Sequence, residues 1–118
     1  MSALRCAYCG KKMGGTLKKN RRSRDHIFPR VTYGRDGPVV IACFDCNSTR
    51  GEMHIMEWLD VLSQRAGAAR QSAAAIAVLD ALPCDQAATR LYDPGMASNI
   101  MNLRTLIQCM LDKQRSRT

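Results

Sequence analysis

The sequence predicts an α+β fold in which a small two-stranded core, held together through cysteines, is followed by a helical extension. Three observations lead to this prediction. Four of the six cysteines form two Cys-x-x-Cys pairs in the first half of the chain. A β-branched run over residues 38–42 (Pro-Val-Val-Ile-Ala) is typical of a strand. From residue 55 onward, apolar residues recur mostly at helical spacing.

The two strands are expected on either side of a turn. The first is predicted over 24–28, where Pro29 would end it. A turn rich in Gly and Asp is predicted over 33–37, and the second strand over 38–42 leads into Cys43. Residues 47–49 (Asn-Ser-Thr), with Glu52 three positions after Thr49, match a capping box and predict that a helix starts there.

Four further helices are predicted from periodicity and caps. The first ends at Gly67, the second ends before Pro83, Asp85 caps a short third, and Asp93-Pro94 starts the fourth. The expected buried face of the first helix is Ile55, Leu59, Leu62 and Ala66. That of the second is Ser72, Ala75, Ile76, Leu79 and Leu82, and that of the fourth is Ile100, Leu103, Ile107 and Met110. The chain is thus divided into a core over 1–60 and a helical extension over 61–118, which packs on the core or forms a homodimer surface.

The net charge of +8 is concentrated in the first half of the chain. Residues 1–52 carry eleven Lys or Arg against four acids, whereas 53–118 carry seven against six. A charge that served only solubility would have no reason to gather in one half, so this half should meet a polyanion. Five basic residues lead directly into Asp25 and are expected to contact phosphates, namely Lys18, Lys19, Arg21, Arg22 and Arg24.

The cysteines indicate a reducing, cytoplasmic setting. A Cys pair this close to the start leaves no room for a secretory signal, and the longest apolar run, 73–79, is too short for a membrane span. In such a setting paired cysteines indicate metal binding more than disulfides. Cys84 and Cys109, without local partners, are expected to be small buried apolar groups.

Two Cys-x-x-Cys pairs separated by 33 residues can surround one tetrahedral zinc ion. Four thiolates leave no open position, so a zinc ion bound by Cys6, Cys9, Cys43 and Cys46 should be structural. Redox-active or unrelated thiols are the alternative interpretation.

The segment Asp25-His26-Ile27-x-Pro29, upstream of Cys43-x-x-Cys46-Asn47-x-x-Arg50-Gly51, resembles the zinc-binding form of the HNH endonucleases, which have a ββα-metal fold. The resemblance covers about residues 6–60. It implies a phage or bacterial metal-dependent endonuclease that acts on double-stranded DNA. His26 would be the general base, Asp25 and Asn47 would hold Mg²⁺ or Mn²⁺, and Arg50, in the first turn of the helix, would hold a phosphate.

These residue types suit the implied chemistry. An imidazole can take a proton from water near neutral pH, and carboxylate and amide oxygens are hard ligands for a divalent ion. Two protein ligands leave sites for the scissile phosphate and the leaving 3′-oxygen. Because neighbours on a strand point to opposite sides, Asp25 and His26 need a bend to act on one metal site.

One departure from the family pattern supports an alternative. The family usually has a middle Asn that orients the catalytic His, but nine positions before Asn47 stands Pro38, and the nearest polar substitute is Asp36. The alternative is a non-catalytic zinc-binding module that binds DNA. A third possibility is a protein-interaction module in which the helical half does the work. Taken singly, Asn47 could be a helix cap, Arg50 a surface charge and His54 a cap or surface residue.

Overall fold

The computed structural model describes residues 4–29 and 37–116, and its described part is an α+β fold. A short 3-10 turn, Lys18–Asn20, leads into an antiparallel hairpin of β1 (Arg22–His26) and β2 (Val39–Cys43). Arg22 pairs with Cys43 and His26 with Val39. The first strand therefore starts two residues before its predicted position. Residues 33–36 of the predicted turn, Asp36 among them, lie outside the described residues.

Helix α2 (Phe44–Arg50) follows β2 without a loop, and its start corrects the capping-box prediction. The N-cap is Cys43, whose Sγ accepts a hydrogen bond from the Cys46 N–H at 3.4 Å. Thr49 lies inside the helix, where its hydroxyl donates to the Asp45 carbonyl at 2.8 Å, and Glu52 lies beyond the C-cap. Arg50 is consequently the last residue of α2 and not part of its first turn.

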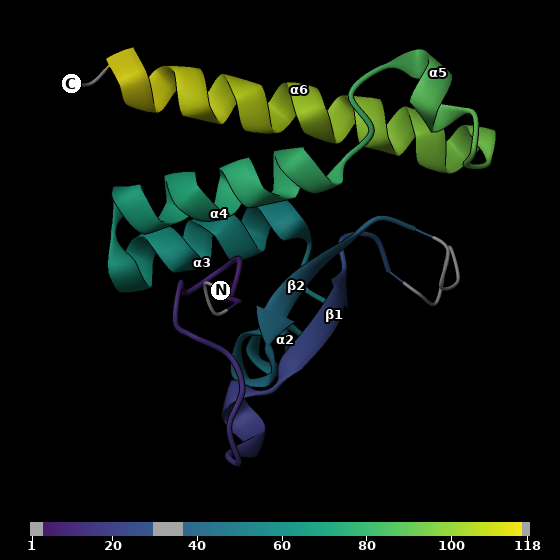
Figure 1. Cartoon of the computed structure of the whole chain (residues 1–118). Helices are drawn as coiled ribbons and strands as arrows, with labels where there is room; N and C mark the ends of the chain where they lie inside the picture. Colours follow the sequence, from purple (N-terminus) through teal and green to yellow (C-terminus); the bar gives the residue numbers. More distant parts are fainter. Residues whose placement is uncertain (1–3, 30–36, 117–118) are drawn as a thin grey trace.

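The remaining helices are α3 (Ile55–Ala66), α4 (Ala68–Ala81), α5 (Gln86–Thr89) and α6 (Pro94–Ser116). The antiparallel pair α3–α4 lies between the hairpin and the long helix α6, which runs along α4 on the outer side (Figure 1). The predicted ends at Gly67 and Asp85 are confirmed, since Gly67 is the C-cap of α3 and Asp85 accepts the Ala88 N–H at the start of α5. His54 caps α3 by accepting the Met56 N–H at 3.1 Å.

The predicted buried faces are confirmed at most positions of α3 and α6 and in part for α4. Ile55, Leu59 and Leu62 are buried in α3, as are Ile100, Leu103 and Ile107 in α6. Ala66, also predicted to be buried, is exposed at the end of α3, and Met110 is half-buried. In α4, Ala75 and the C-cap Leu82 are buried as predicted and Ser72 and Leu79 are half-buried, but Ile76 is 50% exposed. The buried face also contains Gln71, Ala74 and Val78, which were not predicted. The small side chains of Ala74 and Ala75 let α4 lie close to its neighbours.

Buried residues from both halves of the described chain belong to one core cluster, in which Tyr8 and Val40 join Trp58 and Ile100. The predicted division at residue 60 falls inside α3. Cys84 and Cys109 are exposed, so their expected burial is wrong; Cys109 lies on α6 away from the buried row through Ile107.

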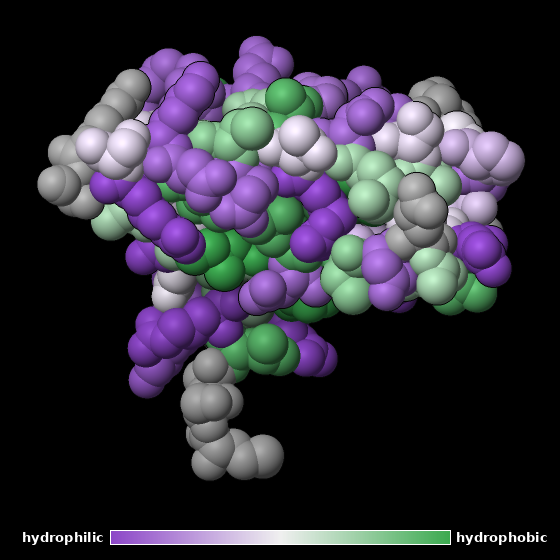
Figure 2. Space-filling model, turned by 90° about the horizontal axis from the view of Figure 1, so that it is seen from above, coloured by the Kyte–Doolittle hydropathy of each residue, from purple (hydrophilic) through white to green (hydrophobic). Residues whose placement is uncertain are grey.

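The face that carries α6 exposes patches of hydrophobic residues among hydrophilic ones (Figure 2). Within the described ranges, no helix combines the length and the hydropathy that a membrane span requires.

Candidate metal centre and active site

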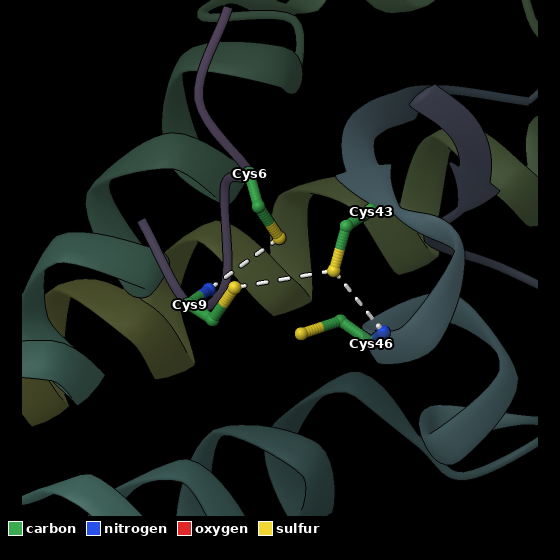
Figure 3. A group of neighbouring side chains, drawn as sticks. All are labelled: Cys6, Cys9, Cys43 and Cys46. Atoms are coloured by element: carbon green, nitrogen blue, oxygen red, sulfur yellow. Dashed lines mark hydrogen bonds between the residues drawn. The ribbon is translucent and has the colours of Figure 1, made fainter. Parts of the chain in front are cut away.

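The four cysteines of the two pairs converge on one point (Figure 3). Cys6 and Cys9 come from a turn near the N-terminus, residues 6–10, called the cysteine turn below. Cys43 comes from the end of β2 and Cys46 from the first turn of α2. All four Sγ atoms lie within 4.8 Å of one another, and the Cys9 and Cys43 sulfurs are 3.9 Å apart. A tetrahedral zinc ion with bonds of about 2.3 Å would place its sulfur ligands about 3.8 Å apart. The cluster could therefore hold a metal ion, and its geometry fits structural zinc.

Backbone N–H groups donate hydrogen bonds to the sulfurs of Cys6 and Cys43. The Cys6 Sγ accepts hydrogen bonds from the N–H groups of Tyr8 and Cys9, each at 3.4 Å. The hydrogen bond from the Cys46 thiol, together with these backbone donors, lowers the pKa of Cys6 to about 4, although burial opposes the shift. The same shared proton raises the pKa of Cys46. A metal ion at the centre would replace that proton.

A second feature is a hollow of about 190 Å³ where the end of β1 meets α2. It brings together five residues that the sequence singled out: Arg24, Asp25, His26, Asn47 and Arg50. Pro29, Gly51 and Glu52 complete its lining. Asp25 is buried and His26 half-buried, as opposite sides of a strand require, yet both border this hollow at the strand end.

Asp25 and Arg50 form an ion pair inside the protein. Nη1 of Arg50 donates to Oδ2 of Asp25 at 2.6 Å, and the two side chains are only 5% and 4% exposed. Oδ2 also accepts a hydrogen bond from the Tyr8 hydroxyl. Burial, followed by the Asp25 carboxylate, raises the pKa of Tyr8, so this tyrosine stays protonated and donates.

Arg50 is thus an internal residue as well as a lining residue. Besides Asp25, its guanidinium donates to the carbonyls of His26 at 3.0 Å, Ile27 at 2.9 Å and Met53 at 3.0 Å. Binding of a phosphate by Arg50 stays a prediction, and these contacts compete with it.

Asn47 and His26, the two remaining residues of the predicted chemistry, each have polar atoms without a hydrogen-bond partner among the described residues. Asn47 lies in the middle of α2, not at its cap, and its Nδ2 donates to the Ser23 hydroxyl, so its Oδ1 can still accept or ligate. Among the described residues, no side chain forms a hydrogen bond with the His26 imidazole. At the position of the expected middle Asn, the Pro38 carbonyl accepts the Ile27 N–H at 3.0 Å, which extends the hairpin by backbone alone.

The five basic side chains that precede Asp25 are all exposed. Of these, Arg24 lines the hollow, and Lys18 holds its Nζ 4.8 Å above the ring of Phe44. Sequence reasoning missed two residues of this region. Glu52 lines the hollow, although its spacing pointed to a helix cap. Tyr8 contacts Asp25, and its only signal was its position between two cysteines.

The chain significantly matches no protein-family model, no curated protein and no solved structure. The residues of the cluster and of the hollow are therefore the whole basis for a functional proposal.

Proposed function

We propose that this protein is a metal-dependent DNA endonuclease of the HNH type, with a ββα-metal core that a zinc ion on the four cysteines holds together. The observation that carries the proposal is the shared hollow of Arg24, Asp25, His26 and Asn47, which lie up to 23 positions apart in the sequence. A general base, two hard oxygen donors and a cation at one polar hollow form the set that phosphodiester hydrolysis needs.

Each side chain has a distinct role in this proposal. His26, half-buried and without a side-chain partner among the described residues, takes the proton of the attacking water. Oδ1 of Asp25 and Oδ1 of Asn47 are the oxygen donors for a divalent ion such as Mg²⁺ or Mn²⁺. Such an ion would supply charge neutralisation for the transition state and the leaving oxygen. Arg24, exposed on β1, binds the phosphate backbone of duplex DNA.

Plasmid cleavage in Mg²⁺ or Mn²⁺ tests the proposal, with the two histidines of the chain as a matched pair. We expect the wild type to cut or nick the plasmid and His26→Ala to lose about 10²- to 10⁴-fold in rate. His54→Ala removes an imidazole that caps α3 and should cut at the wild-type rate. Equal cleavage by wild type and His26→Ala, or no cleavage under a broad screen of metals, would refute the catalytic role.

One observation favours a second candidate, a non-catalytic zinc-binding module that binds DNA. The Asp25 carboxylate is already neutralised by Arg50, which weakens its attraction for a divalent ion. This candidate predicts DNA binding that is unchanged by Mg²⁺ or by His26→Ala and that weakens steeply with salt. In a fluorescence-anisotropy titration, Arg24→Gln should reduce the slope of log K against log salt by about 1. Negligible DNA binding at physiological salt would contradict both candidates.

A further inference from the structure

Tyr8 connects the cysteine cluster to the hollow that contains His26. It stands between Cys6 and Cys9, and its own N–H donates to the Cys6 sulfur. Its side chain is fully buried, with its ring edge-on to Trp58 at a centroid distance of 5.5 Å and an interplanar angle of 79°. The backbone of the cysteine turn and the ring of Trp58 therefore fix the position of the Tyr8 hydroxyl.

That hydroxyl acts on one oxygen of Asp25. Both donors to this carboxylate, the Tyr8 hydroxyl and Nη1 of Arg50, bind Oδ2. Within the residues that the structure describes, Oδ1 receives no hydrogen bond. Two donors on one oxygen fix the plane of the carboxylate and leave Oδ1 as the atom that can ligate an ion. A phenylalanine would fill the same space in the core, so packing alone does not require the hydroxyl.

We propose that Tyr8 is a positioning residue that orients Asp25 for a divalent ion, and that it thereby makes the ion site depend on the cysteine cluster. This inference rests on the proposed nuclease function. Groups that hydrogen-bond to a metal ligand orient it, and their loss typically weakens metal affinity or activity by about 10- to 100-fold. Tyr8 would act in this way from a turn that the cysteine cluster itself shapes.

The test uses the full, zinc-loaded chain and measures Mn²⁺ affinity from the spin-resonance signal of free Mn²⁺. Tyr8→Phe should bind Mn²⁺ about 10- to 100-fold more weakly than the wild type. Tyr92→Phe, the same deletion in the turn between α5 and α6, should bind like the wild type. A cobalt-substituted sample should give the same tetrathiolate absorption for Tyr8→Phe as for the wild type, which shows that the cluster is intact.

The double variant separates positioning from a general structural effect. In an Asp25→Asn background, Tyr8→Phe should change the remaining affinity by less than about 2-fold, because its effect passes through Asp25. Wild-type affinity in Tyr8→Phe, or an equal loss in both backgrounds, would overturn the role of Tyr8 and leave the nuclease proposal standing. If the wild type binds Mn²⁺ no better than Asp25→Asn does, the ion site itself is absent and both proposals fall.

Discussion

At the scale of single residues, Arg50 is a cation with the surroundings of an internal residue, since it is only 5% exposed. Its donors reach the Asp25 carboxylate and three backbone carbonyls, those of His26, Ile27 and Met53. A planar guanidinium can satisfy acceptors in several directions at once, whereas a lysine ammonium on a flexible stem cannot hold the same fork. Arg50 thereby ties the C-terminal end of α2 to the end of β1, next to the candidate general base.

Replacing Arg50 should therefore destabilise the folded protein. We expect Arg50→Met to lower the free energy of unfolding by about 3–5 kcal/mol, because it leaves the Asp25 carboxylate buried without its counter-charge. Urea denaturation measures the change. Arg24→Met, at an exposed position two residues from His26, should change stability by no more than about 0.5 kcal/mol.

A double variant checks the cause of that loss. Asp25→Asn combined with Arg50→Met removes both charges, so it should be more stable than Arg50→Met alone. If Arg50→Met costs no more than Arg24→Met, the internal contacts of Arg50 contribute nothing to stability, and its predicted contact with a phosphate gains support.

At the scale of elements, the cysteine turn packs against α4 through Gly10 and Arg70. Gly10 has a positive φ of 79°, and a Cβ at this position would lie 2.6 Å from Nη1 of Arg70. Gly15 has nearly the same φ, 81°, but nothing lies within 4 Å of its Cβ position. The two glycines thus separate the conformational cost of a side chain from the cost of displacing the Arg70 guanidinium.

Alanine at each position should show this difference in urea denaturation. Gly15→Ala should cost about 1–2 kcal/mol, which is the usual penalty for a side chain in left-handed backbone. Gly10→Ala should cost more, because Arg70 must also move away from the turn. In an Arg70→Ala background the two substitutions should become equal. If they are already equal in the wild-type background, Arg70 does not hold the turn against α4.

The features that were predicted correctly depend on residues close together in the sequence. Gly67 and Asp85 end or start helices through contacts with their own neighbours in the chain, and the four cysteines were recognised from their spacing alone. The start of α2 was missed because its cap is the sulfur of Cys43, a residue that capping rules do not include among the preferred types. The buried face of α4 was predicted only in part because an alanine-rich helix offers little contrast between its sides.

The candidate site likewise contains residues that a sequence motif predicted and contacts that the sequence did not predict. The motif named Asp25, His26 and Asn47, and the hollow brings them together. The burial of Arg50 and the contact of Tyr8 with Asp25 join residues 25 and 17 positions apart. Such contacts depend on how α2 and the cysteine turn pack against β1, which neither periodicity nor spacing specifies.

At the scale of the whole molecule, the cysteine cluster lies at the edge of the core, because Cys9 and Cys46 are only partly buried against it. Cys6 and Cys43 are buried in the same cluster of residues as Trp58 and Ile100. The cysteine turn is also joined to β2 by the hydrogen bond from the Ala7 N–H to the Ile41 carbonyl at 3.0 Å. A metal ion on the four sulfurs would therefore hold the cysteine turn, the hairpin and α2 together.

Stripping that metal should loosen the whole core. Structural zinc contributes about 10–16 kcal/mol in zinc-finger peptides, as much as the entire stability of a small domain. We expect chelation to lower Tm by more than about 10 °C. The emission of Trp58 should shift to longer wavelength, since this sole tryptophan is 1% exposed and lines a small hollow with Cys9 and Cys46.

Serine substitutions separate loss of the metal from loss of a thiol. Cys9→Ser should reproduce the effect of chelation, whereas Cys109→Ser, at an exposed thiol on α6, should leave Tm, emission and zinc content unchanged. Metal content measured on the same samples makes the comparison decisive. A chain that has lost its zinc but keeps its Tm and its buried Trp58 would show that packing alone holds the turn in place, and Tyr8 would then keep its contact with Asp25 without the metal.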